Sequence, residues 1–405
     1  MTDADPSPIR PARRRFRTAI VSGAVLALVA GAVTLGALSR TTAENPHHTE
    51  KHDALEARLG SLVDAGYPAA LAAVTEPDGD HIDVAVGKGD IATGQKAEAG
   101  GEVRIGSNTK MFVATIVMQL VDEGRVSLDE PIETYLPGLV RGEEIDGAAI
   151  DVRSLLQHTS GLPEYADTIA EDAFGLRETY ISPRDMLDVA LEQPAAFAPG
   201  ERYEYSNTNY LLLGLLIERV TERALWEQIE ERIVEPLGLT HTYLPVPGDR
   251  GLRGEHPNGY HAEVPGELKD ITTMDPSFAW AAGALVSTPR ELNIFMQALL
   301  GGELVSEESL AEMKKGVPAG DELWPEATYG LGVQSYPLSC GGIVWGHGGD
   351  IPGTQTRNAV GPDGTAVTIA VTALPWAIVD PRDEKRLLDQ YRLVVDVLDE
   401  TLCGR

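Results

Sequence analysis

The alternation of apolar and polar positions predicts strands near both ends of the chain. Two short β-rich runs, over 69–74 and 82–86, flank the turn residues Pro77-Asp78-Gly79-Asp80, and this arrangement predicts a hairpin. Towards the C-terminus, runs that alternate or are apolar between glycines predict further strands over 329–333, 343–345, 356–360 and 366–372. Both ends of the chain can therefore contribute to one sheet.

Helical spacing fills the rest of the chain. A helix is predicted over 53–65 and another over 108–123, where apolar residues lie almost all round and indicate burial. Further helices are predicted over 210–220, 225–234, 288–300 and 381–402. Strands at both ends with helices between them predict an α+β fold. One antiparallel sheet formed by both termini is flanked by helices, a mostly helical subdomain is inserted over about 108–285, and the active site is expected in the seam.

The N-terminal region has a different pattern. A basic segment over 1–17 precedes an uncharged apolar run over 18–38, and a polar stretch over 39–51 follows. An apolar run of this length suits either a cleavable signal peptide or a membrane anchor, and both place the remaining chain outside the cytoplasm. We therefore expect a cytoplasmic segment, a signal or anchor, a linker, and a catalytic domain over 52–405 that is secreted or held at the cell membrane.

Composition and charge exclude several classes of function. The formal net charge of −29 argues against nucleic-acid binding, because the chain has no surplus of cations to replace the counterions around phosphates. The nine histidines are scattered, no His-Glu-x-x-His occurs, and the adjacent His47 and His48 have no third ligand at a characteristic spacing. We therefore expect neither a metal nor a cofactor.

The first chemical motif is Ser107-Asn108-Thr109-Lys110, the only Ser-x-x-Lys in the chain. A spacing of three on a helix brings the hydroxyl and the amine to one face. Serine is a weak nucleophile at neutral pH and needs a base, and a buried lysine with a lowered pKa can accept its proton. Taken alone, the pattern also fits a serine that caps the helix while Lys110 lies in solvent.

Two further motifs each occur once. Tyr205-Ser206-Asn207 precedes an apolar helix, so a phenol that can relay a proton and an amide that can hold a substrate project from one loop. His347-Gly348-Gly349 ends a strand-like run, and glycines at a strand edge allow an extended substrate to approach closely. Capping by Ser206 or Asn207, and a turn formed by the two glycines, are the alternatives without chemistry.

The order Ser-x-x-Lys, Tyr-x-Asn, His-x-Gly resembles the serine penicillin-recognising enzymes, in particular the branch of class C β-lactamases, exported D-alanyl-D-alanine carboxypeptidases and related esterases. The resemblance extends over about 55–405 and includes Gln119 to Gly124, Tyr135 to Leu139, His158 to Leu162 and Tyr205 to Tyr210. The stretch His158-Thr159-Ser160-Gly161 is a structural helix–loop junction in that family, so we do not assign His158 and Ser160 to a separate catalytic dyad.

The resemblance implies a role for each motif residue. Ser107 is the acylated nucleophile, Lys110 its base and Tyr205 the proton relay. Asn207 holds the substrate, the His347-Gly348-Gly349 strand binds it, and His347 supports the leaving-group side. The backbone N–H groups of Ser107 and Asp350 form the oxyanion hole.

The two cysteines, Cys340 and Cys403, suit an oxidising compartment, and we expect them to be paired. Such a bridge closes a loop of roughly 60 residues. Their local sequences, Leu338-Ser339-Cys340-Gly341 and Leu402-Cys403-Gly404-Arg405, resemble the exported carboxypeptidase including its disulfide. Two buried free thiols are the alternative.

The chain departs from the carboxypeptidase pattern where that family binds the substrate's terminal carboxylate. Gly348, Asp350 and Gln334 stand where two threonines and an arginine are expected, so the hydroxyls and the fixed cation are missing and an acid is added. An ionised Asp350 would repel a carboxylate at 4 Å by roughly 4 kcal/mol at an effective dielectric constant near 20. Substrates with a free C-terminal carboxylate are therefore expected to be poor, and esters, amides or cationic ends better.

These features predict a serine hydrolase or acyl transferase that forms an acyl-enzyme on Ser107. The resemblance favours a penicillin-binding enzyme like D-alanyl-D-alanine carboxypeptidase, acting as a monomer on a small peptide, ester or β-lactam. A β-lactamase, an esterase, a D-amino-acid amidase, and a receptor that binds β-lactams or peptidoglycan fragments without turnover are the alternatives.

Overall fold

The computed structural model describes residues 46–169, 172–321 and 323–404. They belong to one of the two compact units of the chain, Asn45–Arg405. The basic segment over 1–17 and the signal or anchor predicted over 18–38 lie outside the described residues. Among the described helices, none is both long enough and apolar enough to cross a membrane.

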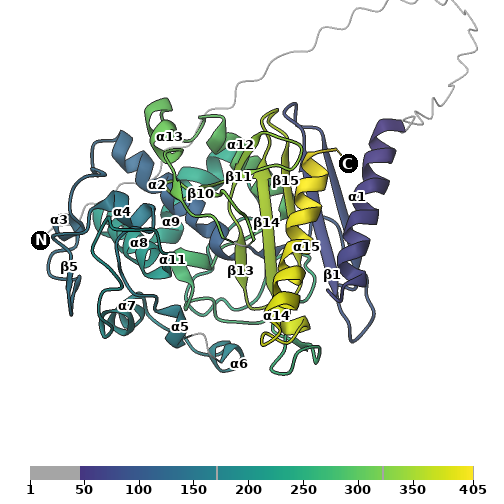
Figure 1. Cartoon of the computed structure of the whole chain (residues 1–405), viewed down its shortest axis with the longest axis horizontal. Coiled ribbons are helices and arrows are strands. Elements are labelled where there is room, and N and C mark those ends of the chain that lie inside the picture. The colour runs from purple at the N-terminus through teal and green to yellow at the C-terminus, as the bar shows by residue number, and fades with distance from the viewer. Residues whose placement is uncertain (1–45, 170–171, 322, 405) are drawn as a thin grey trace, which may run out of the picture. The chain divides into compact units, whose positions relative to one another are not determined.

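A nine-stranded antiparallel sheet forms the centre of this unit (Figure 1). Its order is β2-β1-β15-β14-β12-β11-β10-β9, and β13 pairs with β14. Strands from the two ends of the chain meet in the middle, since Ala72 of β1 pairs with Ile369 of β15. The bounds of these strands are β1 Ala69–Thr75, β2 His81–Gly87, β9 Val317–Pro318, β10 Thr328–Tyr329, β11 Gln334–Pro337, β12 Ile343–Gly346, β13 Gly349–Ile351, β14 Thr354–Val360 and β15 Ala366–Val371. The predicted α+β class, with a sheet built from both termini, is confirmed.

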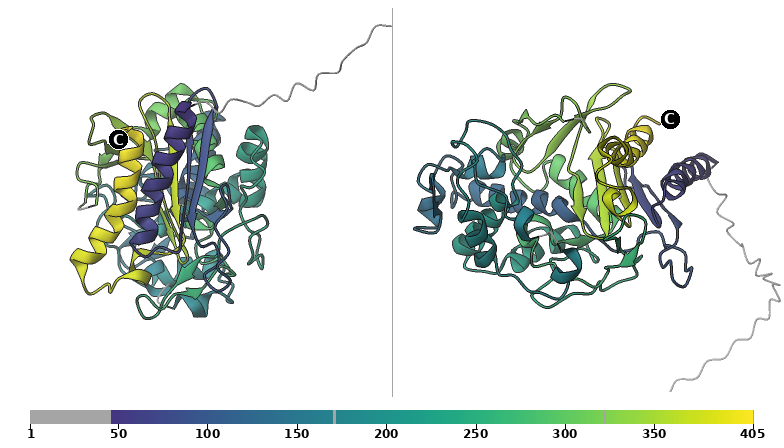
Figure 2. Two further views of the ribbon diagram at one scale, coloured as in Figure 1. Left: turned by 90° about the vertical axis from the view of Figure 1, so that its right-hand side faces the viewer. Right: turned by 60° about the horizontal axis from the view of Figure 1, so that its bottom comes forward.

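Helices cover both faces of the sheet because its central strands are apolar on both sides. Alternate residues of β1 belong to different cores: Ala70 and Ala72 pack with α1 Pro46–Asp64 and α15 Glu384–Leu402, whereas Leu71 faces α12 Pro289–Leu300. Figure 2 shows α1 and α15 side by side over one face. The opposite face carries α12 and, beyond it, the helical subdomain.

The helical subdomain is built around the apolar helix α2 Thr109–Asp122, which contacts α8 Asn207–Thr221 and α11 Trp280–Gly283. Phe112 of α2 stacks on Phe295 of α12, with ring centroids 3.7 Å apart, so α2 is also fixed to the layer against the sheet. The other helices are α3 Ile132–Tyr135, α4 Val152–Leu156, α5 Ala166–Ile169, α6 Ala173–Leu176, α7 Pro183–Leu191, α9 Leu225–Ile229, a π-helical turn Glu230–Val234, α10 Glu235–Leu237, α13 Glu307–Met313 and α14 Pro375–Ile378. Three two-stranded ribbons complete the fold: β3 Val103–Arg104 with β8 Val286–Ser287, β4 Arg141–Gly142 with β5 Ile145–Asp146, and β6 Tyr260–His261 with β7 Lys269–Asp270.

Two predicted boundaries are wrong. The linker predicted over 39–51 overlaps α1, which begins at Pro46. The first turns of α1 carry no apolar stripe, so periodicity could not reveal them. They are held instead by polar contacts with the hairpin, since Lys51 pairs with Glu76 at 2.6 Å and His48 Nε2 lies 3.2 Å from the His81 carbonyl oxygen.

Of the strand predicted over 329–333, only Tyr329 lies in a strand, at the end of β10, and residues 330–333 form the turn between β10 and β11. A Cβ at Gly330 would lie 1.9 Å from the Met313 carbonyl oxygen, and Gly332 has φ +80°. The apolar residues Leu331 and Val333 are buried in this turn without forming a strand. The turn is important for the site because it holds Tyr329.

The structure pairs Cys340 with Cys403, which ties the turn before β12 to the C-terminal end of α15. The bridge spans a sequence separation of 63 residues. Closing a loop of that length removes conformational freedom from the unfolded chain, with a stabilisation of about 4 kcal/mol in the chain-entropy model.

We predict that the double variant Cys340→Ala, Cys403→Ala unfolds at lower urea concentration than the wild type, with a loss of roughly 2–4 kcal/mol in unfolding free energy. The bridge touches none of the motif residues, so kcat/KM at 25 °C should stay within about twofold. Urea titrations of the wild type with and without reductant check the effect independently. An unchanged midpoint in both experiments would show that the bridge contributes no stability.

Candidate active site

The predicted nucleophile, Ser107, lies in a 3-10 turn, Gly106–Asn108, directly before α2, which we call the nucleophile turn. Gly106 has φ +51°, and a Cβ there would lie 2.7 Å from the backbone nitrogen of Asp350. Only glycine therefore allows this turn to lie against β13. Asn108 fixes the turn to β14, because its amide donates to Thr356 Oγ1 at 2.5 Å and its carbonyl accepts from Asn358.

Lys110 lies one helical turn after Ser107 and is completely buried. Its Nζ is 3.0 Å from Ser107 Oγ, 2.7 Å from Asn207 Oδ1 and 2.8 Å from the Ala282 carbonyl oxygen. The two carbonyl oxygens can only accept hydrogen bonds, so each accepts from one N–H group of a neutral amine. The remaining lone pair then faces the Ser107 hydroxyl, which is the arrangement a general base requires.

Burial sets the protonation of this lysine. Desolvation lowers the pKa of Lys110 from 10.5 to about 7, and the negative charge of Glu164 partly opposes that shift. Glu164 does not touch the amine. Its Oε2 accepts from the backbone N–H of Asn207 at 2.6 Å and from the Asn207 side-chain amide at 3.0 Å. Glu164 thus orients the amide that accepts from Lys110.

Tyr205 contacts the same group from the loop before α8. The Lys110 Nζ lies 4.8 Å from the Tyr205 ring centroid, and the ring stacks on His158 at 4.2 Å. Burial raises the pKa of Tyr205 well above 10, although a hydrogen bond with Ser107 acts in the opposite direction. At neutral pH the phenol therefore keeps its proton, and Lys110 is the group that can accept one.

The His347-Gly348-Gly349 segment, between β12 and the start of β13, forms the opposite wall. A Cβ at Gly349 would lie 2.0 Å from the Ile105 carbonyl oxygen, so glycine allows β13 to approach the nucleophile turn. Ser107 and Asp350, the predicted oxyanion pair, border the same two cavities. The His347 side chain is buried, and its Nε2 lies 2.9 Å from the Tyr329 hydroxyl.

Two cavities meet at Ser107, Asn207 and Asp350. The larger, of about 830 Å³, is walled mainly by apolar and aromatic side chains that include Tyr165, Ala173, Phe174, Phe278, Leu374 and Trp376. The smaller, of about 330 Å³, is bordered by Tyr205, His347, Gln334, Trp324, Tyr336 and Arg357. Because the predicted proton relay Tyr205 borders the smaller cavity, we assign that cavity to the leaving group and the larger one to the acyl group.

Arg357 corrects the sequence-based expectation that no fixed cation stands on the leaving-group side. Its guanidinium is buried and binds both carboxylate oxygens of Asp350, at 2.8 Å and 3.2 Å. Asp350 pairs with Gln355 across the β13–β14 hairpin, and Arg357 is two residues further on the same face. This diagonal neighbour was not apparent from the motif spacing. Burial alone lowers the pKa of Arg357, but the charge and hydrogen bonds of Asp350 outweigh it and raise that pKa.

Three residues of this site were not identified from the sequence: Glu164, Arg357 and Tyr329. None of them belongs to a motif that signals chemistry by spacing. His158 and Ser160, which we did not assign to a dyad, are both buried, and Ser160 Oγ donates to Asn209 Oδ1 while His158 interacts with Tyr205 and Tyr329.

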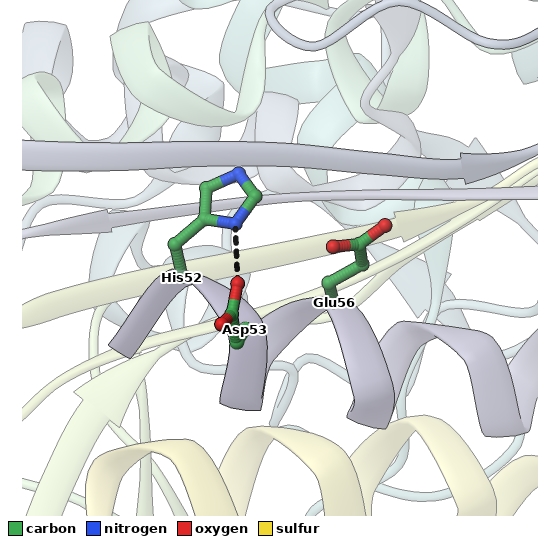
Figure 3. Close-up of side chains that lie close together, drawn as sticks. All are labelled: His52, Asp53 and Glu56. Carbon is green, nitrogen blue, oxygen red and sulfur yellow. Dashed lines mark ion pairs between the residues drawn. The ribbon is translucent and has the colours of Figure 1, made fainter. Parts of the chain in front are cut away.

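The described residues also bring three potential metal ligands together outside the cleft, on α1. His52, Asp53 and Glu56 have ligand atoms within 4.8 Å of one another, and His52 Nδ1 lies 3.7 Å from Asp53 Oδ1 (Figure 3). Both carboxylates are exposed to solvent, and nothing else at this surface points to an ion. We assign it no function.

Known proteins resemble this chain in fold and sequence. A D-stereospecific amidohydrolase from Streptomyces sp. superposes with a TM-score of 0.76 at 34% identity, over 87% of this chain and 99% of that one. The D-amino acid amidase of Ochrobactrum anthropi SV3, solved with L-phenylalanine amide, gives 0.74 at 25% identity, over 87% and 99%. A relative from Salmonella paratyphi A, provisionally named a D-alanyl-D-alanine carboxypeptidase, is 24% identical over 70% of this chain and 72% of its own length.

The first curated relatives, Staphylococcus aureus proteins named flp, are 31–32% identical over 153 residues, and the chain spans 30% of their length. The profile of the family described as Beta-lactamase matches residues 49–391. That range includes the nucleophile turn, both motif loops and the sheet that carries them. The chain belongs to the Beta-lactamase family of serine hydrolases.

Proposed function

We propose that this protein is an amidohydrolase that cleaves amides, esters or peptides of D-amino acids whose leaving group carries no free carboxylate, through an acyl-enzyme on Ser107. The proposal rests mainly on one observation. Both carboxylate oxygens of Asp350 bind Arg357, the one cationic side chain among the described residues that border the leaving-group cavity. The pair is neutral overall, so no free cation is available to bind a substrate carboxylate.

The acyl-enzyme would form in three linked proton and charge movements. The neutral Lys110 amine takes the Ser107 proton as Oγ attacks the substrate carbonyl carbon. The negative charge that develops on the carbonyl oxygen is stabilised by the N–H groups of Ser107 and Asp350. Tyr205 then gives its proton to the leaving nitrogen or oxygen and regains one from Lys110. Water later attacks the ester, and the same groups act in reverse.

The acyl cavity supports a substrate with an apolar or aromatic side chain, since Phe174, Phe278 and Trp376 form part of its wall. The solved relatives of 25% identity or more point in the same direction, because a D-stereospecific amidohydrolase and a D-amino acid amidase each superpose over almost their whole length. The preference for D-configured substrates rests on those relatives.

A carboxypeptidase is the second candidate, and Arg357 is the observation that favours it. A substrate carboxylate could bind the guanidinium if Asp350 moved away. Removing one partner from a buried ion pair costs about 3–5 kcal/mol, and the incoming carboxylate would offset this only in part while Asp350 stays within the same cleft. The amidohydrolase is therefore the better candidate.

We predict that kcat/KM for D-phenylalanyl-D-alanine is at least tenfold lower as the free acid than as the C-terminal amide, with release of alanine or alaninamide followed by chromatography. Ser107→Ala should abolish both reactions. Asp350→Asn keeps the backbone N–H but frees Arg357, so the acid should improve about tenfold relative to the amide. A wild type that prefers the acid would instead identify a carboxypeptidase.

The lowered pKa of Lys110 predicts the pH dependence. Since the reaction needs the neutral amine, kcat/KM should fall as the pH drops below about 7 and the amine becomes protonated, and should level off above it. The charge of Glu164 raises the pKa of Lys110, so Glu164→Gln should shift this acidic limb to lower pH while keeping an oxygen to accept from Asn207. A limb that stays in place or moves upward would contradict the assignment of Lys110 as the base.

A further inference from the structure

The hydroxyl of Tyr329 lies between two buried histidines. It is 3.1 Å from His158 Nε2, on the helical side of the cleft, and 2.9 Å from His347 Nε2, on the sheet side. All three side chains are completely or almost completely buried. Tyr329 reaches this position from the end of β10, where the turn with Gly330 and Gly332 begins.

The direction of the first hydrogen bond follows from the other nitrogen of His158. His158 Nδ1 lies 3.1 Å from the backbone nitrogen of Ser206, which can only donate, and the amide of Asn209 lies at the same distance. Nδ1 is therefore an acceptor and carries no proton. Burial lowers the pKa of His158 well below 6.5, so the ring is neutral and its single proton is on Nε2. His158 thus donates to the Tyr329 oxygen.

The second hydrogen bond is fixed in the same direction from the opposite end. His347 Nδ1 contacts the carbonyl oxygen of Gly348, which can only accept, so Nδ1 carries the proton. Burial lowers the pKa of His347 to about 3, and the neutral ring therefore has its lone pair on Nε2. Tyr329 completes the chain by donating to that lone pair. The Tyr210 hydroxyl also lies in hydrogen-bond contact with Tyr329, but it donates its own proton to the Leu156 carbonyl oxygen at 3.0 Å, so it could only accept from Tyr329. Donation to Tyr210 would leave the buried His347 lone pair without a donor, so we assign the Tyr329 proton to His347 Nε2.

We infer that Tyr329 is a positioning residue that joins the two walls of the cleft through a hydrogen-bond chain of fixed direction, from His158 Nε2 through the Tyr329 hydroxyl to His347 Nε2. On one side, His158 stacks on Tyr205 and accepts from the loop that carries Asn207. On the other, His347 donates to Gly348 next to the substrate-binding strand. Tyr329 does not border either cavity and acts only through these neighbours.

The hydrogen-bond chain changes the role that the sequence suggested for His347. Both of its ring nitrogens are engaged, one by Tyr329 and one by Gly348, so neither is free to bind or protonate a leaving group. His347 supports the leaving-group side only by holding the strand in place. Proton donation to the leaving group then depends on Tyr205, whose ring position depends on His158 and hence on Tyr329.

Because the position of Tyr205 depends on Tyr329, loss of the Tyr329 hydroxyl should affect substrates differently according to their leaving groups. An amide nitrogen must be protonated as it leaves, whereas p-nitrophenolate leaves without a proton. A shift of Tyr205 should therefore slow acylation by an amide much more than acylation by an activated ester of the same acyl group. The inference rests on the proposed acyl transfer through Ser107 and Tyr205, but the hydrogen-bond chain itself can be observed without turnover.

The test compares Tyr329→Phe with the wild type on D-phenylalanine anilide and the p-nitrophenyl ester of D-phenylalanine. We expect kcat/KM to fall about tenfold or more for the anilide and less than twofold for the ester. Tyr67→Phe is the matched control. Its buried hydroxyl also has two partners, Gln355 at 3.3 Å and the Gln390 carbonyl oxygen at 3.2 Å, but lies in the core against α1 and α15. That variant should leave the anilide-to-ester ratio unchanged, and thermal melting confirms that both variants fold.

Histidine 15N NMR of the full chain near pH 7 provides the measurement that does not depend on activity. Two neutral buried rings of opposite tautomer are expected, with the proton of His158 on Nε2 and that of His347 on Nδ1, and the acceptor nitrogen of His347 should shift in Tyr329→Phe. A His347 protonated on Nε2 would overturn the inference, as would equal losses on the two substrates. If the wild type cleaved neither substrate, the proposed function would have failed. The NMR result would still decide whether the hydrogen-bond chain through Tyr329 exists.

Discussion

The site depends on the burial of the Lys110 amine, which disfavours its positive charge. The amine is sealed between α2, the Tyr205 loop and α11, where water cannot solvate an ammonium group, and its pKa is lowered to about 7. The neutral amine donates hydrogen bonds to two carbonyl oxygens, those of the Asn207 side chain and the Ala282 backbone. Its lone pair is then left facing the Ser107 hydroxyl. The proposed catalytic pair, Ser107 and Lys110, therefore depends on burial, and the apolar packing around α2 is needed for the proposed chemistry as much as the serine itself.

Two buried polar connections then hold the helical and sheet layers at a fixed distance. Asn108 joins the nucleophile turn to β14, and Tyr329 joins His158 to His347. Each lies in a dry environment, where a hydrogen bond left unmade costs about 1–3 kcal/mol. Small shifts between the layers are thereby opposed. The predicted oxyanion hole requires this fixed geometry, because Ser107 and Asp350 come from different layers.

The proposed leaving-group side depends on one buried ion pair, between Asp350 and Arg357. Asp350 supplies a backbone N–H to the predicted oxyanion hole while its side chain neutralises Arg357. The same residue thus contributes to two functions through different atoms. Exchange of its side chain should alter selectivity with little effect on the backbone donor, so substrate preference can change without loss of the chemistry.

The sequence by itself determined the fold class, the hairpin and most of the long elements, because strand alternation and helical spacing report local burial directly. It also indicated Ser107, Lys110, Tyr205, Asn207 and the glycine strand, since these lie in short motifs whose spacing is preserved on a helix, a loop or a strand. The errors arose where the pattern carries no apolar signal, as in the first turns of α1, or where apolar residues are buried in a turn, as at Leu331.

Only the tertiary structure decided what surrounds each motif. Glu164 contacts Asn207 across 43 residues, and Tyr329 bridges two histidines 189 positions apart, so no local spacing could reveal them. Arg357 is only seven positions from Asp350, but their contact depends on the strand register of the β13–β14 hairpin, which the motif spacing does not give. These contacts orient the amide beside Lys110, neutralise Arg357 next to the smaller cavity and engage Nε2 of His347. Each depends on distance and burial in three dimensions, and therefore on how strands and helices pack.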